Sequence, residues 1–116
     1  MIKIYYLSSC STCTRIINEL DLKNKKIEFQ DIKTEKISAI QLTEMKKLAG
    51  SYEALFSKIA MKYRALGLDK LDLTEEDYKK YILEEYTFLK RPVIIINDKI
   101  FIGNSKSTIA SAKEHL

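Results

Sequence analysis

Both cysteines of this 116-residue chain lie in one Cys-x-x-Cys motif, formed by Cys10 and Cys13, that follows an apolar run at the N-terminus. The run over residues 2–7 predicts a buried strand, and the spacing of apolar residues from about 11 to 22 predicts an amphipathic helix. A helix N-terminus carries unpaired N–H groups and a partial positive charge, which stabilise a thiolate. The motif therefore predicts an exposed nucleophile at Cys10 and a resolving thiol at Cys13, one turn further along the same face.

Two other uses of the cysteine pair stay open at this point. Cys-x-x-Cys can supply half of a zinc site, although the chain has no third cysteine and its single histidine is His115. The two cysteines can also act only as small buried hydrophobic residues. A motif that follows a strand and opens a helix favours a redox-active or redox-sensing pair. We therefore expect no metal and no organic cofactor.

The composition is typical of a globular protein, with 46% hydrophobic and 31% charged residues. No apolar run approaches the roughly 20 residues needed to cross a bilayer, and the N-terminus lacks a signal-peptide profile. We expect a cytoplasmic protein without membrane association, in which a disulfide would be transient. The net charge of +4 comes from lysines scattered along the chain, so direct binding to nucleic acid is not expected.

Sheet-forming segments lie near both ends of the chain. Residues 26–32 alternate polar and apolar side chains, which predicts a second strand, parallel to the first, in a βαβ unit. Residues 93–96 and 99–102 are apolar runs on either side of an Asn-Asp turn, which predicts an antiparallel hairpin. A closing helix is expected over about 106–114, capped at Asn104-Ser105.

The stretch between these segments predicts three helices. Ser38 and Gln41 have the spacing of a capping box, for a helix that ends at Gly50. We expect its apolar residues to be Ile40, Leu42, Met45 and Leu48. A second helix is expected to begin between 51 and 57 and to end at Gly67, and a third is expected from Thr74 to about Tyr86. No linker composition separates them, so we expect one domain over 1–116, with a core at 1–34 and 88–116 and a helical insertion at about 35–87.

Three segments of the chain resemble the ArsC/Spx family: Ser9-Cys10-x-x-Cys13, Tyr63-Arg64-Ala65-Leu66-Gly67-Leu68 and Leu89-Lys90-Arg91-Pro92-Val93-Ile94. The family comprises glutaredoxin-coupled arsenate reductases, related proteins and the Spx transcription regulators. The resemblance covers essentially the whole chain. It implies an α/β, thioredoxin-like fold, in which a mixed four-stranded sheet (βαβ…ββα) carries a helical subdomain inserted between the second and third strands.

The resemblance also implies roles for the residues around the only proline, Pro92. In thioredoxin-like folds a cis proline at this place lies against the reactive cysteine, which would bring Arg91 near the sulfur of Cys10. A trans proline at the start of a strand, with a solvated Arg91, is the alternative. Ser9 and Ser11, which flank the cysteine, are expected to contact the substrate together with Pro92.

The oxyanion-binding residues of the arsenate reductases are incompletely matched. Arg91 corresponds to one of their arginines, but Tyr6 stands where they have a histidine that lowers the cysteine pKa. Ser57 stands at a second arginine, with Lys58 beside it as a partial substitute, and the third arginine has no counterpart near Gly103. The resemblance therefore implies a thiol–disulfide oxidoreductase that reduces arsenate inefficiently.

Two functions follow from the resemblance. In the first, an enzyme related to arsenate reductases is regenerated by thioredoxin or by glutaredoxin and glutathione. In the second, an Spx-like redox-switched regulator binds the α subunit of RNA polymerase rather than DNA, as the Cys-x-x-Cys pair of Spx proteins suggests.

Overall fold

The computed structural model describes residues 1–116, which form two compact units. The sheet unit consists of 1–36 and 91–116, and the helical unit consists of 37–90. In chain order the strands and α-helices are β1 (Ile2–Tyr6), α1 (Ser11–Glu19), β2 (Glu28–Asp31), α2 (Ala39–Ala49), α3 (Met61–Ala65), α4 (Glu75–Glu84), β3 (Val93–Ile96), β4 (Lys99–Ile102) and α5 (Lys106–Glu114). Short 3-10 helices are η1 (Leu22–Asn24), η2 (Glu53–Leu55), η3 (Leu68–Lys70) and η4 (Tyr86–Phe88). None of the helices has the length and apolarity needed to cross a membrane.

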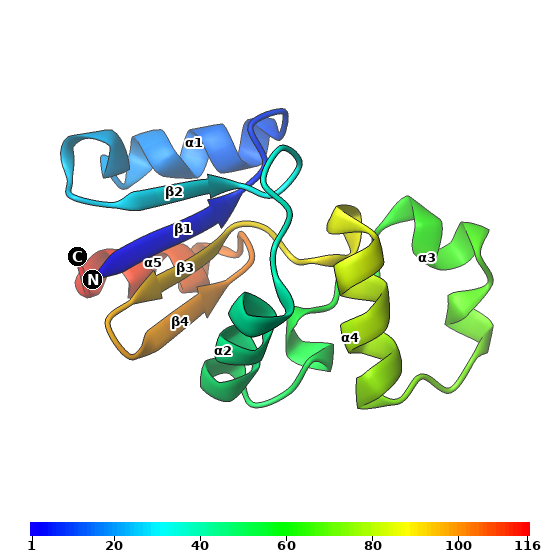
Figure 1. Ribbon diagram of the computed structural model, residues 1–116. Coiled ribbons are helices and arrows are strands. Elements are labelled where there is room, and N and C mark those ends of the chain that lie inside the picture. Colours follow the sequence, from blue (N-terminus) through cyan, green and yellow to red (C-terminus); the bar gives the residue numbers. More distant parts are fainter. The chain divides into compact units, whose positions relative to one another are not determined.

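The sheet unit contains one mixed sheet with the strand order β2-β1-β3-β4 (Figure 1). Strand β1 pairs in parallel with β2 and antiparallel with β3, and β3 pairs antiparallel with β4. The predicted βαβ unit and C-terminal hairpin are thus confirmed. The hairpin turn contains Asn97, whose φ of 55° lies in the left-handed region that asparagine tolerates.

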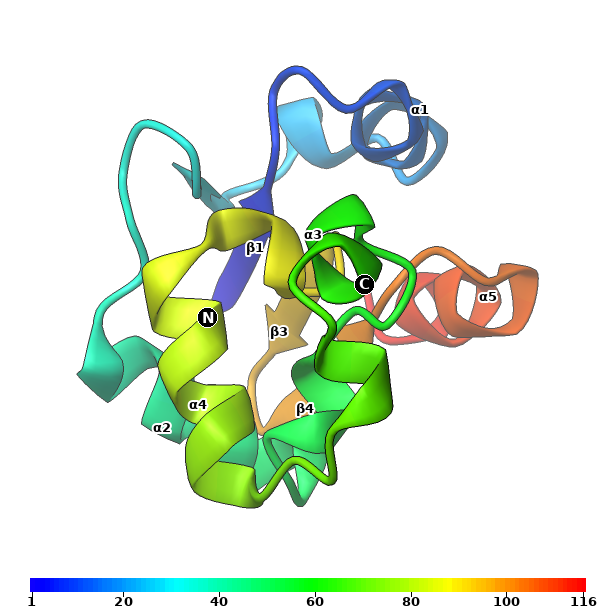
Figure 2. The ribbon, with the colours of Figure 1, turned by 90° about the vertical axis from the view of Figure 1, so that its right-hand side faces the viewer.

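One face of this sheet packs against α1 and α5, which lie on the same side of it (Figure 2). The shared core consists of Ile4, Ile16, Ile17, Leu20, Leu22, Ile94, Ile96, Ile109 and Ala112. The apolar residues predicted for the first helix supply three of these positions, so the helix is held on the sheet by its buried face. The start of α1 is therefore placed at the carboxyl end of β1.

The helical unit begins both of its longer helices at the predicted residues and ends α2 at the predicted Gly50, whereas α4 ends at Glu84, before the predicted Tyr86. In α2 the Ser38 hydroxyl accepts the Gln41 N–H and the Gln41 side chain accepts the Ser38 N–H, as a capping box requires. The helix ends at Gly50, whose φ of 97° favours glycine. Thr74 caps α4 in the same way with Asp77, so the local signals at both helix starts are confirmed.

The predicted second helix is wrong in extent. Only η2 and the five-residue α3 form in this stretch, because Phe56 between them is extended and pairs with Leu89 in an antiparallel bridge. The Ser57 N–H donates to the Phe88 carbonyl at 2.7 Å, which takes these residues out of any continuous helix. Gly67 does follow α3 with a left-handed φ of 72°, so the predicted end is confirmed.

Aromatic rings form the centre of the helical unit. Phe56 stacks on Phe88 with ring centroids 5.0 Å apart and contacts Tyr78 at 4.9 Å and Tyr63 at 5.7 Å. In α2, Leu42 and Met45 are fully buried, whereas Ile40 and Leu48 are exposed. Two of the four apolar residues expected in α2 therefore lie outside the core.

Candidate functional site

The turn between β1 and α1 places Cys10 at the very start of the helix. The Cys10 N–H donates to the Leu7 carbonyl at 3.0 Å, which closes a tight turn through Ser8 and Ser9. Cys10 is the N-cap residue of α1, with extended φ and ψ of −92° and 112°, and its carbonyl accepts the Thr14 N–H at 3.2 Å. Its thiol therefore stands where a helix usually has a capping hydroxyl or carboxylate.

The two thiols are close but differ in exposure. Cys10 is half-buried, whereas Cys13 has no solvent-exposed surface. The two cysteines form no disulfide, and the Cys13 thiol is within hydrogen-bonding reach of the Cys10 sulfur. No group of three or more His, Cys, Asp or Glu side chains is arranged to hold a metal ion. The geometry therefore brings together two thiols, one accessible and one enclosed.

The surroundings of Cys10 favour its thiolate. Partial burial acts to raise the pKa of Cys10, but the N–H groups of Cys13 and Thr12, the Cys13 thiol and the Arg91 charge outweigh it. The pKa of Cys10 consequently lies below that of an ordinary thiol.

The surroundings of Cys13 have the opposite effect. The pKa of Cys13 is raised to about 11, chiefly by burial and in addition by the neighbouring Cys10. The Leu7 backbone and Arg91 oppose this only in part. At neutral pH the pair therefore holds a reactive sulfur at Cys10 and a protonated one at Cys13.

The Arg91–Pro92 peptide bond is cis and leads directly into β3. Pro92 is buried, and its carbonyl accepts the Gly103 N–H at 2.9 Å. The Nε atom of Arg91 is buried as well, and the charge of its guanidinium lowers the pKa of both thiols. Arg91 is thus close enough to act electrostatically on the cysteine pair.

The two serines that flank Cys10, Ser9 and Ser11, are exposed. Ser8 makes a contact that the sequence analysis missed, because its hydroxyl donates to Asp31 at the end of β2. Parallel pairing of Tyr6 with Asp31 brings the two segments together. The signal that could have revealed it is an acidic residue at the carboxyl end of the strand beside β1.

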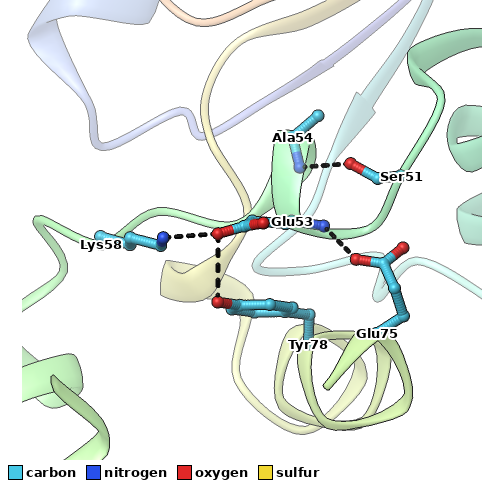
Figure 3. A network of polar contacts seen from close by, with 6 residues as sticks. All are labelled: Ser51, Glu53, Ala54, Lys58, Glu75 and Tyr78. Carbon is cyan, nitrogen blue, oxygen red and sulfur yellow. Dashed lines mark hydrogen bonds and ion pairs between the residues drawn. The ribbon is translucent and has the colours of Figure 1, made fainter. Parts of the chain in front are cut away.

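Lys58 belongs to the helical unit, where it takes part in a polar network (Figure 3). Its Nζ pairs with Glu53 Oε2 at 2.6 Å, and the Tyr78 hydroxyl donates to the same oxygen at 3.3 Å. This pairing lowers the pKa of Glu53 and raises the pKa of Lys58. Part of the positive charge of Lys58 is therefore balanced within its own unit, and its contact with a substrate stays a prediction.

Glu75 extends this network to the start of η2. Its carboxylate accepts the Glu53 N–H at 3.1 Å, as Figure 3 shows, and the Tyr52 N–H at 2.7 Å. Because these N–H groups begin a short helix, a carboxylate satisfies both. The segment that carries Lys58 is thus attached to α4.

The known proteins to which this chain is similar include arsenate reductases. A curated arsenate reductase of Haemophilus influenzae is 38% identical over 47 residues, which make up 40% of each chain, so the match spans two fifths of that relative. A structure of a possible arsenate reductase from Streptococcus mutans has a TM-score of 0.72 at 28% identity, covering 91% of this chain and 92% of that one. An arsenate reductase structure from Vibrio cholerae has a TM-score of 0.80 at 16% identity, covering 99% and 97%, and shows the fold alone.

The thioredoxin-like α/β fold expected from the sequence is confirmed by these structural neighbours. A model of the ArsC family matches residues 5–112, which include the cysteine pair, Lys58, Arg91 and Pro92. Since this match covers nearly all of the sequence, the chain belongs to the ArsC family.

Proposed function

We propose that this protein is a thiol–disulfide oxidoreductase of the arsenate-reductase type, in which Cys10 is the nucleophile and Cys13 resolves the adduct. The observation that carries the proposal is the placement of an accessible thiol at the start of α1 and a buried thiol one turn further on, which shifts the two pKa values in opposite directions. A thiolate attacks faster than a thiol. A neighbouring thiol that stays protonated can then attack the mixed disulfide and complete the thiol–disulfide exchange.

With a disulfide substrate the Cys10 thiolate forms a bond to one substrate sulfur, and the other sulfur leaves with the electron pair of the broken bond. Cys13 then loses its proton and attacks the Cys10 sulfur, which releases the second substrate thiol and leaves a Cys10–Cys13 disulfide. With arsenate, Cys10 displaces water from As(V). Attack by Cys13 on the Cys10 sulfur then breaks the S–As bond and leaves the electron pair on arsenic as As(III).

Arsenate is expected to be a poor substrate for this chain. Its charge needs several fixed donors, and Arg91 is the one family arginine that has a match. Tyr6 replaces the family histidine, and Lys58 is a flexible point charge that already pairs with Glu53. A substrate with less negative charge, such as a mixed disulfide, makes smaller demands on the site.

The oxidised pair has to be reduced by an external dithiol, and we assign this role to thioredoxin or to glutaredoxin with glutathione. The chemistry described needs no bound metal or organic cofactor, since both electrons come from the two thiols. A cytoplasmic location suits this cycle, because cytoplasmic thiol systems keep such disulfides transient.

The test is a reductase assay with arsenate and with a mixed disulfide of glutathione as separate substrates. Each is supplied with thioredoxin or with glutaredoxin and glutathione. We expect turnover of the mixed disulfide to exceed turnover of arsenate, and the Cys10→Ser variant to be inactive with both. Equal activity of the wild type and Cys10→Ser would refute the proposal.

An Spx-like regulator is the second candidate, and the N-cap position of Cys10 favours it. A Cys10–Cys13 disulfide would take the Cys10 sulfur away from the N–H groups of α1, and the surface at the helix start would change. Stoichiometric capture of the RNA polymerase α subunit by only one redox form would support this function. Equal capture, or none, by both forms would count against it.

A further inference from the structure

The turn that carries Cys10 is attached to the neighbouring strand through one side-chain contact. The Ser8 hydroxyl donates to Asp31 Oδ2 at 2.5 Å, and Asp31 Oδ1 accepts the Lys33 N–H at 3.1 Å. Both oxygens of the Asp31 carboxylate are therefore engaged, one by the cysteine turn and one by the turn that follows β2.

Asp31 is itself held firmly in place. It pairs with Tyr6 at the end of the parallel β1–β2 ladder, and the Ile32 N–H donates to the Tyr6 carbonyl at 2.9 Å. Its own carbonyl accepts the Glu35 N–H at 2.8 Å. A carboxylate fixed in this way gives Ser8 a rigid partner, because its position is set by the sheet and not by the cysteine turn.

Ser8 lies at a position of the turn from which it can affect Cys10 directly. The turn runs from the Leu7 carbonyl to the Cys10 N–H, with Ser8 and Ser9 at its two corners. Its conformation determines where the chain enters α1, and so whether the Cys10 sulfur faces the N–H groups at the helix start. We propose that Asp31 is a positioning residue that, through its hydrogen bond to Ser8, holds Cys10 at the N-terminus of α1. This inference rests on the proposed function, because it deepens the role of Cys10 as the nucleophile.

A positioning role and a purely electrostatic role of Asp31 predict opposite changes in the Cys10 pKa when Asp31 is replaced. The pKa of Asp31 is lowered, chiefly by the hydrogen bond from Ser8, so this carboxylate is ionised at neutral pH. A negative charge near a thiol raises the thiol pKa, so an effect of charge alone would make Cys10 more acidic when Asp31 is removed. Loss of a positioning contact would make Cys10 less acidic, because its sulfur would leave the donors that stabilise the thiolate. The sign of the change therefore distinguishes the two effects.

The experiment measures the rate of Cys10 alkylation by iodoacetamide between pH 5 and pH 10, with peptide mass spectrometry to separate Cys10 from Cys13. The variants are Ser8→Ala, Asp31→Ala and Asp31→Asn. Asn keeps an oxygen that accepts from Ser8 while the charge is lost. Glu28→Gln is the matched control, since it removes one negative charge from the same strand at its pair with Lys3. The free energy of unfolding of each variant is measured in parallel.

We expect Ser8→Ala and Asp31→Ala to raise the Cys10 pKa and to slow alkylation at pH 7 by roughly threefold to tenfold. Asp31→Asn should lie closer to the wild type than Asp31→Ala, and Glu28→Gln should match the wild type. A lower Cys10 pKa in both Asp31 variants, or unchanged reactivity in both alanine variants, would overturn the proposal. If Asp31→Ala fails to fold, Ser8→Ala decides alone. The assay needs no substrate, so its failure is distinct from failure of the proposed reductase activity.

Discussion

Cys10 and Cys13 lie one turn apart at the start of α1, and the protein shifts their thiol pKa values in opposite directions. Cys10 is the half-buried N-cap residue of α1, where the N–H groups of Cys13 and Thr12 favour its thiolate, whereas Cys13 is fully buried. The same three-residue spacing thus gives two environments, because Cys13 lies on the buried face of α1 with Ile16 and Ile17, whereas Cys10 lies in the turn before the helix. This difference underlies the expected order of attack.

The first prediction concerns the acidity of Cys10. A pH profile of iodoacetamide alkylation should give a Cys10 pKa below the ordinary thiol value of about 8.5, because the helix N–H groups and Arg91 favour the thiolate. Cys13 should stay unmodified until the protein unfolds or the pH approaches 11. An ordinary pKa for Cys10 would contradict the site described.

The same shift should appear in the pH dependence of stability. A thiol with a lowered pKa in the folded state stabilises the protein fully above its unfolded-state pKa, and this contribution is lost as the pH falls through the folded-state pKa. The free energy of unfolding of the wild type relative to Cys10→Ser should therefore rise from acid pH to about pH 8.5. Parallel curves for the two proteins would argue against a stabilised thiolate.

The second prediction concerns the resolving thiol. Cys13→Ser should accumulate a mixed disulfide between Cys10 and glutathione, because no second thiol is within reach to displace it. Mass spectrometry of the intact protein after exposure to oxidised glutathione measures this adduct. The wild type should instead end as the intramolecular disulfide, and Cys10→Ser should take up little glutathione. Absence of the adduct from Cys13→Ser would remove the resolving role.

The third prediction concerns Arg91. Arg91→Ala should raise the Cys10 pKa and slow alkylation at pH 7 by roughly twofold to tenfold, because the guanidinium charge favours the thiolate. Arg91→Lys keeps a charge and should retain part of the effect. Arg15→Ala is a suitable control, since Arg15 pairs with Glu19 on the exposed side of α1. Equal rates for Arg91→Ala and the control would assign Arg91 no part in the site.

The fourth prediction concerns Lys58 and arsenate. If Lys58 helps to hold the oxyanion, Lys58→Ala should raise KM for arsenate by roughly twofold to fivefold, the range expected for an exposed charge pair. Turnover of a neutral disulfide should stay the same. Glu53→Gln should lower KM for arsenate, because it removes the carboxylate that pairs with Lys58. Unchanged KM in both variants would restrict Lys58 to the network of the helical unit.

The fifth prediction concerns Glu75. Glu75→Ala should lower the free energy of unfolding by about 1.5–3 kcal/mol, because two backbone N–H groups lose a charged acceptor. Glu76→Ala removes the same charge from the first turn of α4 and serves as the control. Chemical denaturation measures both. If the two variants lose equal stability, the effect belongs to the helix dipole and not to the contact with η2.

Local sequence signals predicted the elements whose structure depends on neighbouring residues. The capping box at Ser38, the helix start at Thr74 and the Asn-Asp hairpin turn are confirmed, because each is built from contacts within a few residues. The second helix was predicted from the same kind of signal and is wrong in extent, since only the five-residue α3 and η2 form there. Phe56 there pairs with Leu89, more than thirty residues away, and that long-range pairing overrides the local preference.

The sequence alone determined where the candidate site lies: two cysteines one turn apart at a helix start, and a single proline after an arginine at the start of a strand. Only the tertiary structure decided what distinguishes the two thiols and what holds them. The burial of Cys13, the charge of Arg91 beside the pair and the bond from Ser8 to Asp31 all depend on segments distant in the chain. The pKa of a thiol is set by the solvent, charges and donors around it, and these are known only once the chain has folded.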